Sequence, residues 1–258
     1  MGALDIGPAG ASRLRAARRV PRPPAPPRRG GAFDHSRYAR ALTAAAPDGW
    51  RVDFGGAARS SDLAAYRRDL AAADPSSLAR DEQLAFWINA YNASLLSLVA
   101  ERMPVPSALD IDGAFSRVRF RIGRSALTAD EIEHGIVRRF GDPRVHFGLN
   151  RAAVGSPPLW AFSGADLARE LEENGRRFLA DEQRGARADG ERVLVSRILR
   201  WFAGDFAPVG TMPSAMGTLL GVLRPARVLP GVRGLLPERL RDARRIGFLG
   251  YDSAVNGG

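Results

Sequence analysis

The sequence predicts an α+β fold, with one helix-rich domain and a small mixed or antiparallel sheet. A segment of about 78–102 carries apolar residues at the three-and-four spacing of a buried helix. Short alternating segments at about 118–122, 192–195 and 246–249 indicate strands. Because helices and strands follow one another without a regular strand–helix repeat, a doubly wound parallel sheet is not expected.

Composition divides the chain into an arm at residues 1–32 and a single globular domain at residues 33–258. The arm holds seven arginines, one aspartate and six prolines, a charge of +6 out of the whole chain's +10. Such a segment has little apolar surface to bury, so we expect it to be disordered. It is either a tether to an acidic surface, anionic lipid or RNA, or a solvated tail.

The first half of the domain is predicted to be mostly helical. Helices are expected through about residue 46, at about 61–73 and at about 78–102. After the strand at 118–122, Thr128 and Glu131 form the pattern of a capping box, in which side chain and backbone bond reciprocally at a helix start. The following helix carries Glu133 and His134 about one and a half turns from its beginning.

Residues 142–159 form the most informative run, D-P-R-V-H-F-G-L-N-R-A-A-V-G-S-P-P-L. Apolar residues alternate with His146, Gly148 and Asn150, which predicts a strand that directs His146 and Asn150 to one face. A Gly-Ser-Pro-Pro turn containing Ser156 follows directly. We therefore expect a built polar site at this place.

The last third is predicted to mix helices with short strands. The expected helices are at about 164–181, through Trp201 and Phe202, at about 213–224 and at about 236–244, and the expected strands are at 192–195 and 246–249.

Four motifs in order relate the chain to a known family. They are Phe86-Trp87-Ile88-Asn89-Ala90-Tyr91-Asn92, Asp130-Glu131-Ile132-Glu133-His134-Gly135-Ile136, the run 142–159, and Phe248-Leu249-Gly250-Tyr251-Asp252. In sequence and spacing they resemble the family known as domain of unknown function 547, over about residues 33–256. The family name implies no activity.

The resemblance also shows what this chain has replaced. Typical relatives carry cysteine where this chain has Arg151 and Ser156, and this chain has no cysteine. A thiolate nucleophile, a disulfide and a cysteine-ligated metal are therefore excluded. If relatives use those cysteines chemically, this copy has lost or replaced that chemistry, and a pseudoenzyme is one interpretation.

The candidate catalytic residues are His146, His134, Ser156 and Glu133. Ser156 could act as a nucleophile with a histidine base and Asn150 to orient it. The Gly-x-Ser-x-Gly pattern of serine hydrolases is absent, because prolines follow Ser156. Each histidine could equally be a hydrogen-bonded packing element.

The candidate ligand-binding residues are Arg151, Asn150, Asn89 and Asn92. Arginine in place of a nucleophile offers a planar cation that can hold a carboxylate or phosphate in two parallel hydrogen bonds. The alternative is that Arg151 pairs internally with Glu133 or Asp142. Asn89 and Asn92, three residues apart on one helix, could instead clamp the backbone of an adjacent loop.

Other ligands have little support in the sequence. His134, His146 and Glu133 suit zinc in type, but their spacing is not that of a metal motif, and we expect no metal and no cofactor. All 38 basic residues are arginine, and no nucleic-acid-binding motif accompanies them, so nucleic-acid binding is not expected. No run is long enough to span a membrane and no export signal is evident, so we expect a cytoplasmic protein, or an exported one if the assigned start is wrong.

The sequence therefore favours a ligand-binding or interaction protein with a degenerate thiol site and a small anionic ligand. The alternative is a hydrolase or transferase that uses Ser156 with a histidine, or a polar site centred on histidine. The two differ in what Ser156 contacts: a histidine nitrogen in an open cleft supports the enzyme, and burial against backbone does not.

Overall fold

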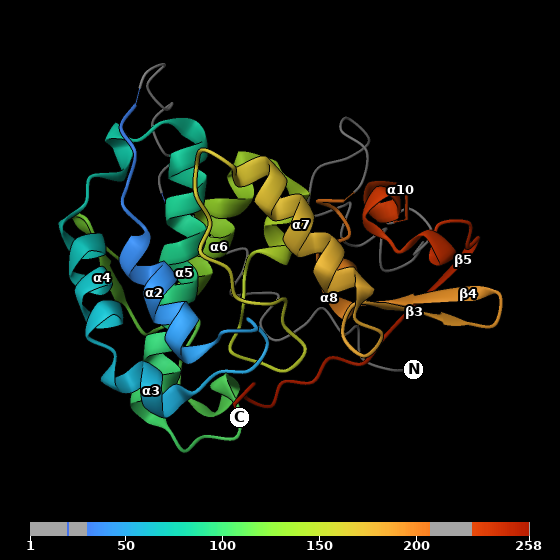
Figure 1. The fold of residues 1–258 in the computed structure, drawn as a ribbon, viewed down its shortest axis with the longest axis horizontal. Helices are drawn as coiled ribbons and strands as arrows, with labels where there is room; N and C mark the ends of the chain where they lie inside the picture. The colour runs from blue at the N-terminus through green and yellow to red at the C-terminus, as the bar shows by residue number, and fades with distance from the viewer. Residues whose placement is uncertain (1–19, 21–29, 207–228, 258) are drawn as a thin grey trace.

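A computed structural model of the chain describes residues 20, 30–206 and 229–257 (Figure 1). The α-helices in this part are α2 (Ser36–Ala45), α3 (Phe54–Arg59), α4 (Ser61–Ala72), α5 (Arg80–Arg102), α6 (Ala129–Gly135), α7 (Leu167–Ala180), α8 (Arg197–Trp201) and α10 (Leu229–Val232). The strands are β1 (Phe120–Ile122), β2 (Ser125–Leu127), β3 (Ala186–Asp189), β4 (Arg192–Val195) and β5 (Arg245–Phe248). Short 3-10 turns lie at η1 (Pro75–Ser77), η2 (Ala108–Asp110), η3 (Val137–Phe140), η4 (Pro143–Phe147), η6 (Arg233–Leu235) and η7 (Glu238–Leu240).

Helix α5 is the centre of the larger core. Residues 83–100 of this helix are all buried, because α3, α4, α6 and α7 pack around it. Asp81 and Glu82 lie in its first turn, where negative charge complements the helix dipole. The predicted central helix at about 78–102 is confirmed, as are those at about 61–73 and through about residue 46.

A second, smaller core surrounds the three-stranded sheet. Strand β4 pairs antiparallel with β3 and parallel with β5, and the buried faces of these strands pack with α8 and the end of α7. In Figure 1 this sheet lies at the opposite end of the molecule from α2 to α4, with α7 between them. Strands β1 and β2 form a separate antiparallel hairpin. These two small sheets among many helices confirm the predicted α+β class.

The start of α6 follows the predicted capping box. The Thr128 hydroxyl accepts a hydrogen bond from the Glu131 amide at 3.1 Å, and the Glu131 carboxylate accepts one from the Thr128 amide at 3.0 Å. Both residues are buried. The cap sets where α6 begins, and so where Glu133 and His134 lie.

The predicted strand around His146 is wrong. Residues 143–147 form the 3-10 turn η4, which Asp142 caps by accepting a hydrogen bond from the Arg144 amide at 2.9 Å. Pro143 at the first position favours this turn, because its fixed φ suits a helical start. Residues 145–150 are all buried, polar and apolar alike, so the alternation in the sequence does not mark one buried and one exposed face.

Two further differences lie elsewhere in the fold. The predicted helix at about 236–244 is wrong, because Pro237 separates two 3-10 turns, η6 and η7. Helix α3 was not predicted, since it has six residues and two of them are glycine. The predicted helix at about 213–224 lies outside the described residues.

The described part of the arm contacts the domain. The Arg139 guanidinium donates to the carbonyl of Val20 at 3.0 Å, and Gly31 bonds to the backbone on both sides of Leu78. Gly31 therefore marks the point at which the chain joins the core.

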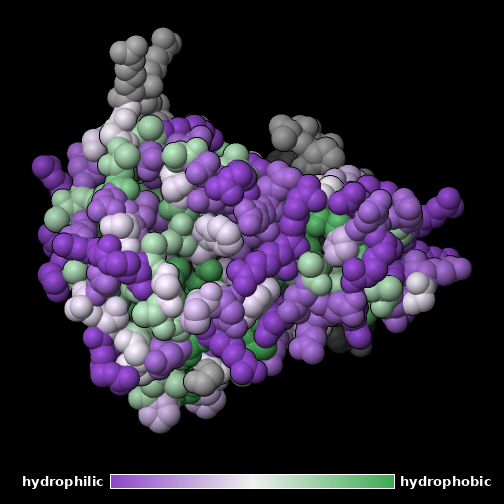
Figure 2. All heavy atoms as spheres, in the orientation of Figure 1, coloured by the Kyte–Doolittle hydropathy of each residue, from purple (hydrophilic) through white to green (hydrophobic). Residues whose placement is uncertain are grey.

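The face shown in Figure 2 is mostly hydrophilic, with hydrophobic atoms scattered in small groups. None of the described helices has the length and apolar character to cross a membrane.

His35 gives a pH dependence to the stability of this fold. Burial lowers the pKa of His35 to about 4, against a smaller opposing effect of Asp34, and its Nδ1 lies 2.7 Å from the Tyr66 hydroxyl. Because the folded pKa is below the unfolded one, near 6.5, this contribution is complete above pH 6.5 and is lost as pH falls toward 4.

We expect the free energy of unfolding to fall by about 2 kcal/mol more in the wild type than in His35→Gln between pH 7 and pH 4.5. Urea denaturation of both proteins at the two pH values measures the difference. Equal losses would show that His35 is charged in the folded protein.

Candidate functional site

Two asparagines of α5 hold the loops that build the site. Asn89 donates to the Phe162 carbonyl at 2.7 Å and accepts from the Phe162 amide at 3.0 Å. Asn92 donates to the Gly148 carbonyl and accepts from the Asn150 amide, both at 2.8 Å. The alternative prediction, that these asparagines clamp a loop, is confirmed, and their amides have no capacity left for a bidentate ligand.

Asn150 shapes the loop that carries Arg151. Its amide donates to the Pro157 carbonyl at 2.7 Å, and its side-chain oxygen accepts from the Ala152 amide at 2.7 Å. Ala152 has φ of 54°, in the left-handed region that costs a non-glycine residue about 1 kcal/mol. The Asn150 side chain stabilises this strained backbone rather than facing a ligand.

Arg151 and Glu133 form a buried ion pair between this loop and α6. Nη2 of Arg151 lies 2.7 Å from each carboxylate oxygen of Glu133. The side chains are 12% and 1% exposed. Burial lowers the pKa of Arg151, but Glu133 and nearby groups raise it more, so its pKa stays above the usual range and it remains charged. Tyr91 of α5 adds a contact to Glu133 at 3.3 Å.

His146 belongs to a second buried polar cluster. Its Nε2 lies 2.8 Å from Asp205, and its ring stacks on Phe202 with centroids 3.8 Å apart. Asp205 also binds Arg138 through two nitrogens, at 2.6 and 2.7 Å. Burial lowers the pKa of His146 despite Asp205, so at neutral pH the imidazole is neutral and donates Nε2–H to the carboxylate.

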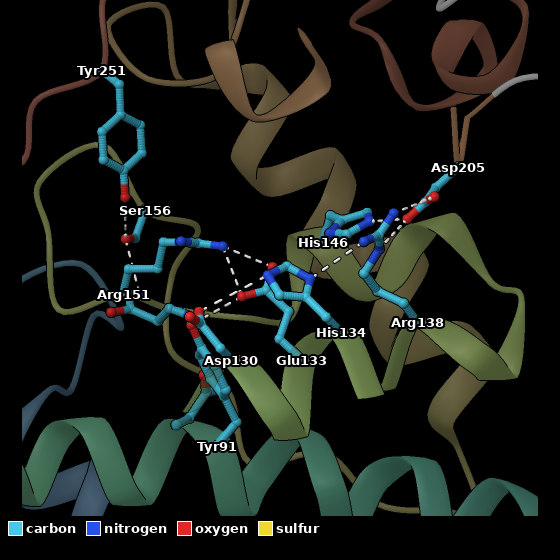
Figure 3. A network of polar contacts seen from close by, with 12 residues as sticks. Tyr91, Asp130, Glu133, His134, Arg138, His146, Arg151, Ser156, Asp205 and Tyr251 are labelled. Atoms are coloured by element: carbon cyan, nitrogen blue, oxygen red, sulfur yellow. Dashed lines mark hydrogen bonds and ion pairs between the residues drawn. The ribbon is translucent and has the colours of Figure 1, made fainter. Parts of the chain in front are cut away.

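The two clusters meet at His134. Its Nδ1 lies 3.3 Å from the Arg138 guanidinium, and its Nε2 lies 3.9 Å from Asp130. Figure 3 shows the resulting line of side chains, which runs from Tyr251, Ser156 and Arg151 to Glu133, His134, Arg138, Asp205 and His146. Both histidines are buried, at 3% and 2% exposure.

Ser156 is held by backbone and by a tyrosine. Its hydroxyl accepts from the Arg151 amide at 3.0 Å and lies 3.0 Å from the Tyr251 hydroxyl. The ring of Tyr251 lies against Gly155, where an added Cβ would come within 2.8 Å of it. Ser156 is 2% exposed, and neither histidine is among its hydrogen-bond partners.

A pocket of about 220 Å³ opens beside Arg151. Phe115, Trp201 and Tyr251 supply aromatic walls, and Arg197 supplies a second guanidinium. Nε and Nη1 of Arg151 have no acceptor among the described residues, and neither atom is sealed from solvent. Glu133 therefore occupies Nη2 of this guanidinium, and Nε and Nη1 are left without a partner among the described residues.

The structure thus brings together some of the expected residues and separates others. His134, Glu133, Arg151 and Ser156 lie in one network, whereas Asn89 and Asn92 are occupied by loops. Sequence reasoning missed several members of the network. They are Tyr91, Asp130, Arg138, Asp205 and Tyr251.

A signal existed for three of these residues, since Tyr91, Asp130 and Tyr251 belong to the family-like motifs. Arg138 and Asp205 lie outside them, and only the fold brings these two side chains together.

No group of three or more potential metal ligands occurs in the described part of the chain. Glu133 is engaged by Arg151, and His146 by Asp205. The histidines and Glu133 therefore do not form a metal site in this arrangement.

Residues 75–179 match the family model described as Protein of unknown function, DUF547. This match confirms the resemblance over the motifs at 86–92, 130–136 and 142–159, while the motif at 248–252 lies beyond it. No curated protein and no solved structure matches the chain.

Loss of the Asn92 clamp tests how this site is supported. Asn92→Ala leaves the Gly148 carbonyl and the Asn150 amide buried without a partner, and each such group costs about 1–3 kcal/mol. We expect destabilisation of at least about 2 kcal/mol in urea denaturation. Ser97→Ala, at a buried position of α5 whose hydroxyl has no hydrogen-bond partner in the described part of the chain, is the matched control and should change stability much less.

A double-mutant cycle tests the ion pair. Arg151→Leu alone leaves Glu133 buried and uncompensated, which typically costs about 3–5 kcal/mol. The double variant Arg151→Leu/Glu133→Leu removes both charges and should recover most of that loss. Additive losses in urea denaturation would contradict a direct pair.

Proposed function

We propose that this protein binds a small anionic molecule in the pocket beside Arg151. The observation that carries the proposal is that Glu133 occupies only one nitrogen of the Arg151 guanidinium. Nη2 is bound to Glu133, Nε and Nη1 have no acceptor among the residues described, and the Arg151 side chain lines the pocket. Nε and Nη1 point to different sides of the guanidinium, and each can donate a charge-assisted hydrogen bond to a carboxylate or phosphate.

The pair with Glu133 supports this role. A guanidinium that Glu133 already holds in place loses less side-chain entropy when a ligand binds it, so the site is preorganised. The rings of Phe115 and Phe202 lie 5.9 and 5.8 Å from the Arg151 guanidinium carbon, which restrains it further. Arg197 also lines this pocket.

The alternative of a hydrolase or transferase has weaker support. The Ser156 hydroxyl is buried and bonded to an amide and a phenol, and none of the described residues is placed as a base to activate it. His146 is buried against Phe202 and Asp205. By the criterion stated from the sequence, this geometry favours binding over catalysis.

Calorimetric titration with acetate, benzoate, sulfate and phosphate tests the proposal. The wild type should bind at least one of these anions in 150 mM salt, which screens non-specific attraction to exposed arginines. Arg151→Gln/Glu133→Gln preserves the net charge but removes the guanidinium, and should weaken binding at least tenfold.

Arg176→Gln, on the exposed face of α7, is the control and should bind as the wild type does. Binding that survives in Arg151→Gln/Glu133→Gln would place the anion elsewhere. A wild type that binds none of the four anions would contradict the proposed function.

A further inference from the structure

We propose a second anion site, in a groove between α4, α5 and β1, for ligands that carry two adjacent phosphates. The groove has a volume of about 510 Å³, within the roughly 300–1,000 Å³ of small-molecule sites. It shares no lining residue with the pocket beside Arg151. The two sites can therefore be tested separately.

Helix α4 supplies one wall of the groove. Ala64, Arg67 and Arg68 line it at the three-and-four spacing that places residues on one face of a helix. Ala71 continues this face one turn later. Because the two alanine side chains are short, the space between the arginines is open to a ligand.

Strand β1 and the residue before it supply the other wall. Arg119 and Arg121 lie two residues apart, which directs both side chains to one side of the strand. All four arginines of the groove are exposed, and no acidic side chain among the described residues lines it. Positive charge therefore borders the groove on two sides.

Two of these arginines are held by carboxylates. Arg119 contacts Glu131 at 3.1 Å, and Glu131 is itself buried in the cap of α6. Arg67 contacts Glu101 of α5, with both side chains exposed. An exposed pair contributes only about 0–1 kcal/mol, so an anion in the groove can share Arg67 with Glu101.

The other two arginines have no carboxylate partner among the described residues. Arg68 makes no hydrogen bond or ion pair with any of them. Arg121 donates through Nε to the Gly123 carbonyl at 3.1 Å, which holds the side chain and leaves both terminal nitrogens for an anion. With Glu101 and Glu131 counted, the groove keeps an excess of two positive charges.

A buried hydroxyl adds a neutral donor. Ser94 of α5 is 4% exposed and lines the groove, and its hydroxyl has no hydrogen-bond partner in the described part of the chain. The Ser97 hydroxyl on the same helix also lacks a partner there, but it is sealed from solvent. The Ser94 hydroxyl is not sealed, so a ligand can supply the missing bond.

These features favour linked phosphates over other small anions. A guanidinium donates two parallel hydrogen bonds to phosphate oxygens, and Arg68 and Arg121 belong to different walls. Two adjacent phosphates offer an acceptor group to each arginine and match the two excess charges. A single phosphate or carboxylate engages fewer of these donors.

Calorimetric titration of the full chain without divalent cations tests the proposal. Pyrophosphate is the probe, phosphate and sulfate carry one anionic group each, and malonate carries two carboxylates. In 150 mM salt we expect pyrophosphate to bind at least about tenfold more tightly than each of the other three.

ADP and AMP identify the source of the diphosphate. ADP that binds more tightly than pyrophosphate would assign the groove to a nucleoside diphosphate, and ADP that binds equally or more weakly would assign it to the inorganic ion. AMP, with one phosphate, should bind more weakly than ADP in either case.

Three variants locate the site. Arg68→Gln/Arg121→Gln removes the two guanidiniums that have no carboxylate partner and should weaken pyrophosphate binding at least about tenfold. Arg176→Gln/Arg187→Gln removes the same charge from exposed positions of α7 and β3 and should bind as the wild type does. Ser94→Ala should weaken binding at least about threefold, since one hydrogen bond to a charged ligand is lost.

The outcomes separate this site from the pocket beside Arg151. Arg151→Gln/Glu133→Gln should keep its affinity for pyrophosphate. Pyrophosphate binding that is lost in that variant but survives in Arg68→Gln/Arg121→Gln would overturn the proposal, as would malonate or phosphate binding as tightly as pyrophosphate, or no binding of pyrophosphate. None of these results would overturn the function proposed for the other pocket.

Discussion

The buried ion pair between Arg151 and Glu133 connects the parts of the molecule that form the site. Glu133 is placed by the capped start of α6, and Arg151 by a loop that Asn92 and Asn150 hold against α5. The Arg151 amide binds Ser156, which in turn contacts Tyr251 near the C-terminus. Together these elements position Arg151 beside the pocket. A buried charge pair is tolerated because both partners are well bonded.

The replacement of a nucleophile by arginine has a physical consequence beyond the loss of chemistry. Where the resemblance places a cysteine, this chain carries a permanent charge that needs a counter-ion, and Glu133 supplies it. The adjacent Ser156 bonds to the loop and to Tyr251 instead of facing a base. The position therefore carries a fixed charge in place of a nucleophile.

Much of the fold could be predicted, because local patterns determine it. The apolar spacing along 78–102 identified α5, and the capping box at Thr128 and Glu131 located α6. Because buried amides need hydrogen-bond partners, the sequence alone indicated that Asn89 and Asn92 could bind the backbone of an adjacent loop. The internal alternative for Arg151 also followed from sequence, since a buried cation requires an acid nearby.

The remainder depends on contacts that no local pattern encodes. The alternation at 142–150 suggested a strand. Residues 143–147 form a 3-10 turn instead, which Asp142 caps and Pro143 begins. Asp205, the partner of His146, lies 59 residues away in sequence. The pocket unites Phe115, Trp201 and Tyr251 from three distant segments, so neither its size nor its aromatic walls could be read from sequence order.

A crystal structure with 4-bromobenzoate tests the central claim most directly, because bromine locates the ligand by its anomalous signal. We expect bromine between Phe115, Trp201 and Tyr251, with the carboxylate bonded to the Arg151 guanidinium and Glu133 still on Nη2. Bromine at another place would contradict the proposed site, as would a carboxylate that does not contact Arg151.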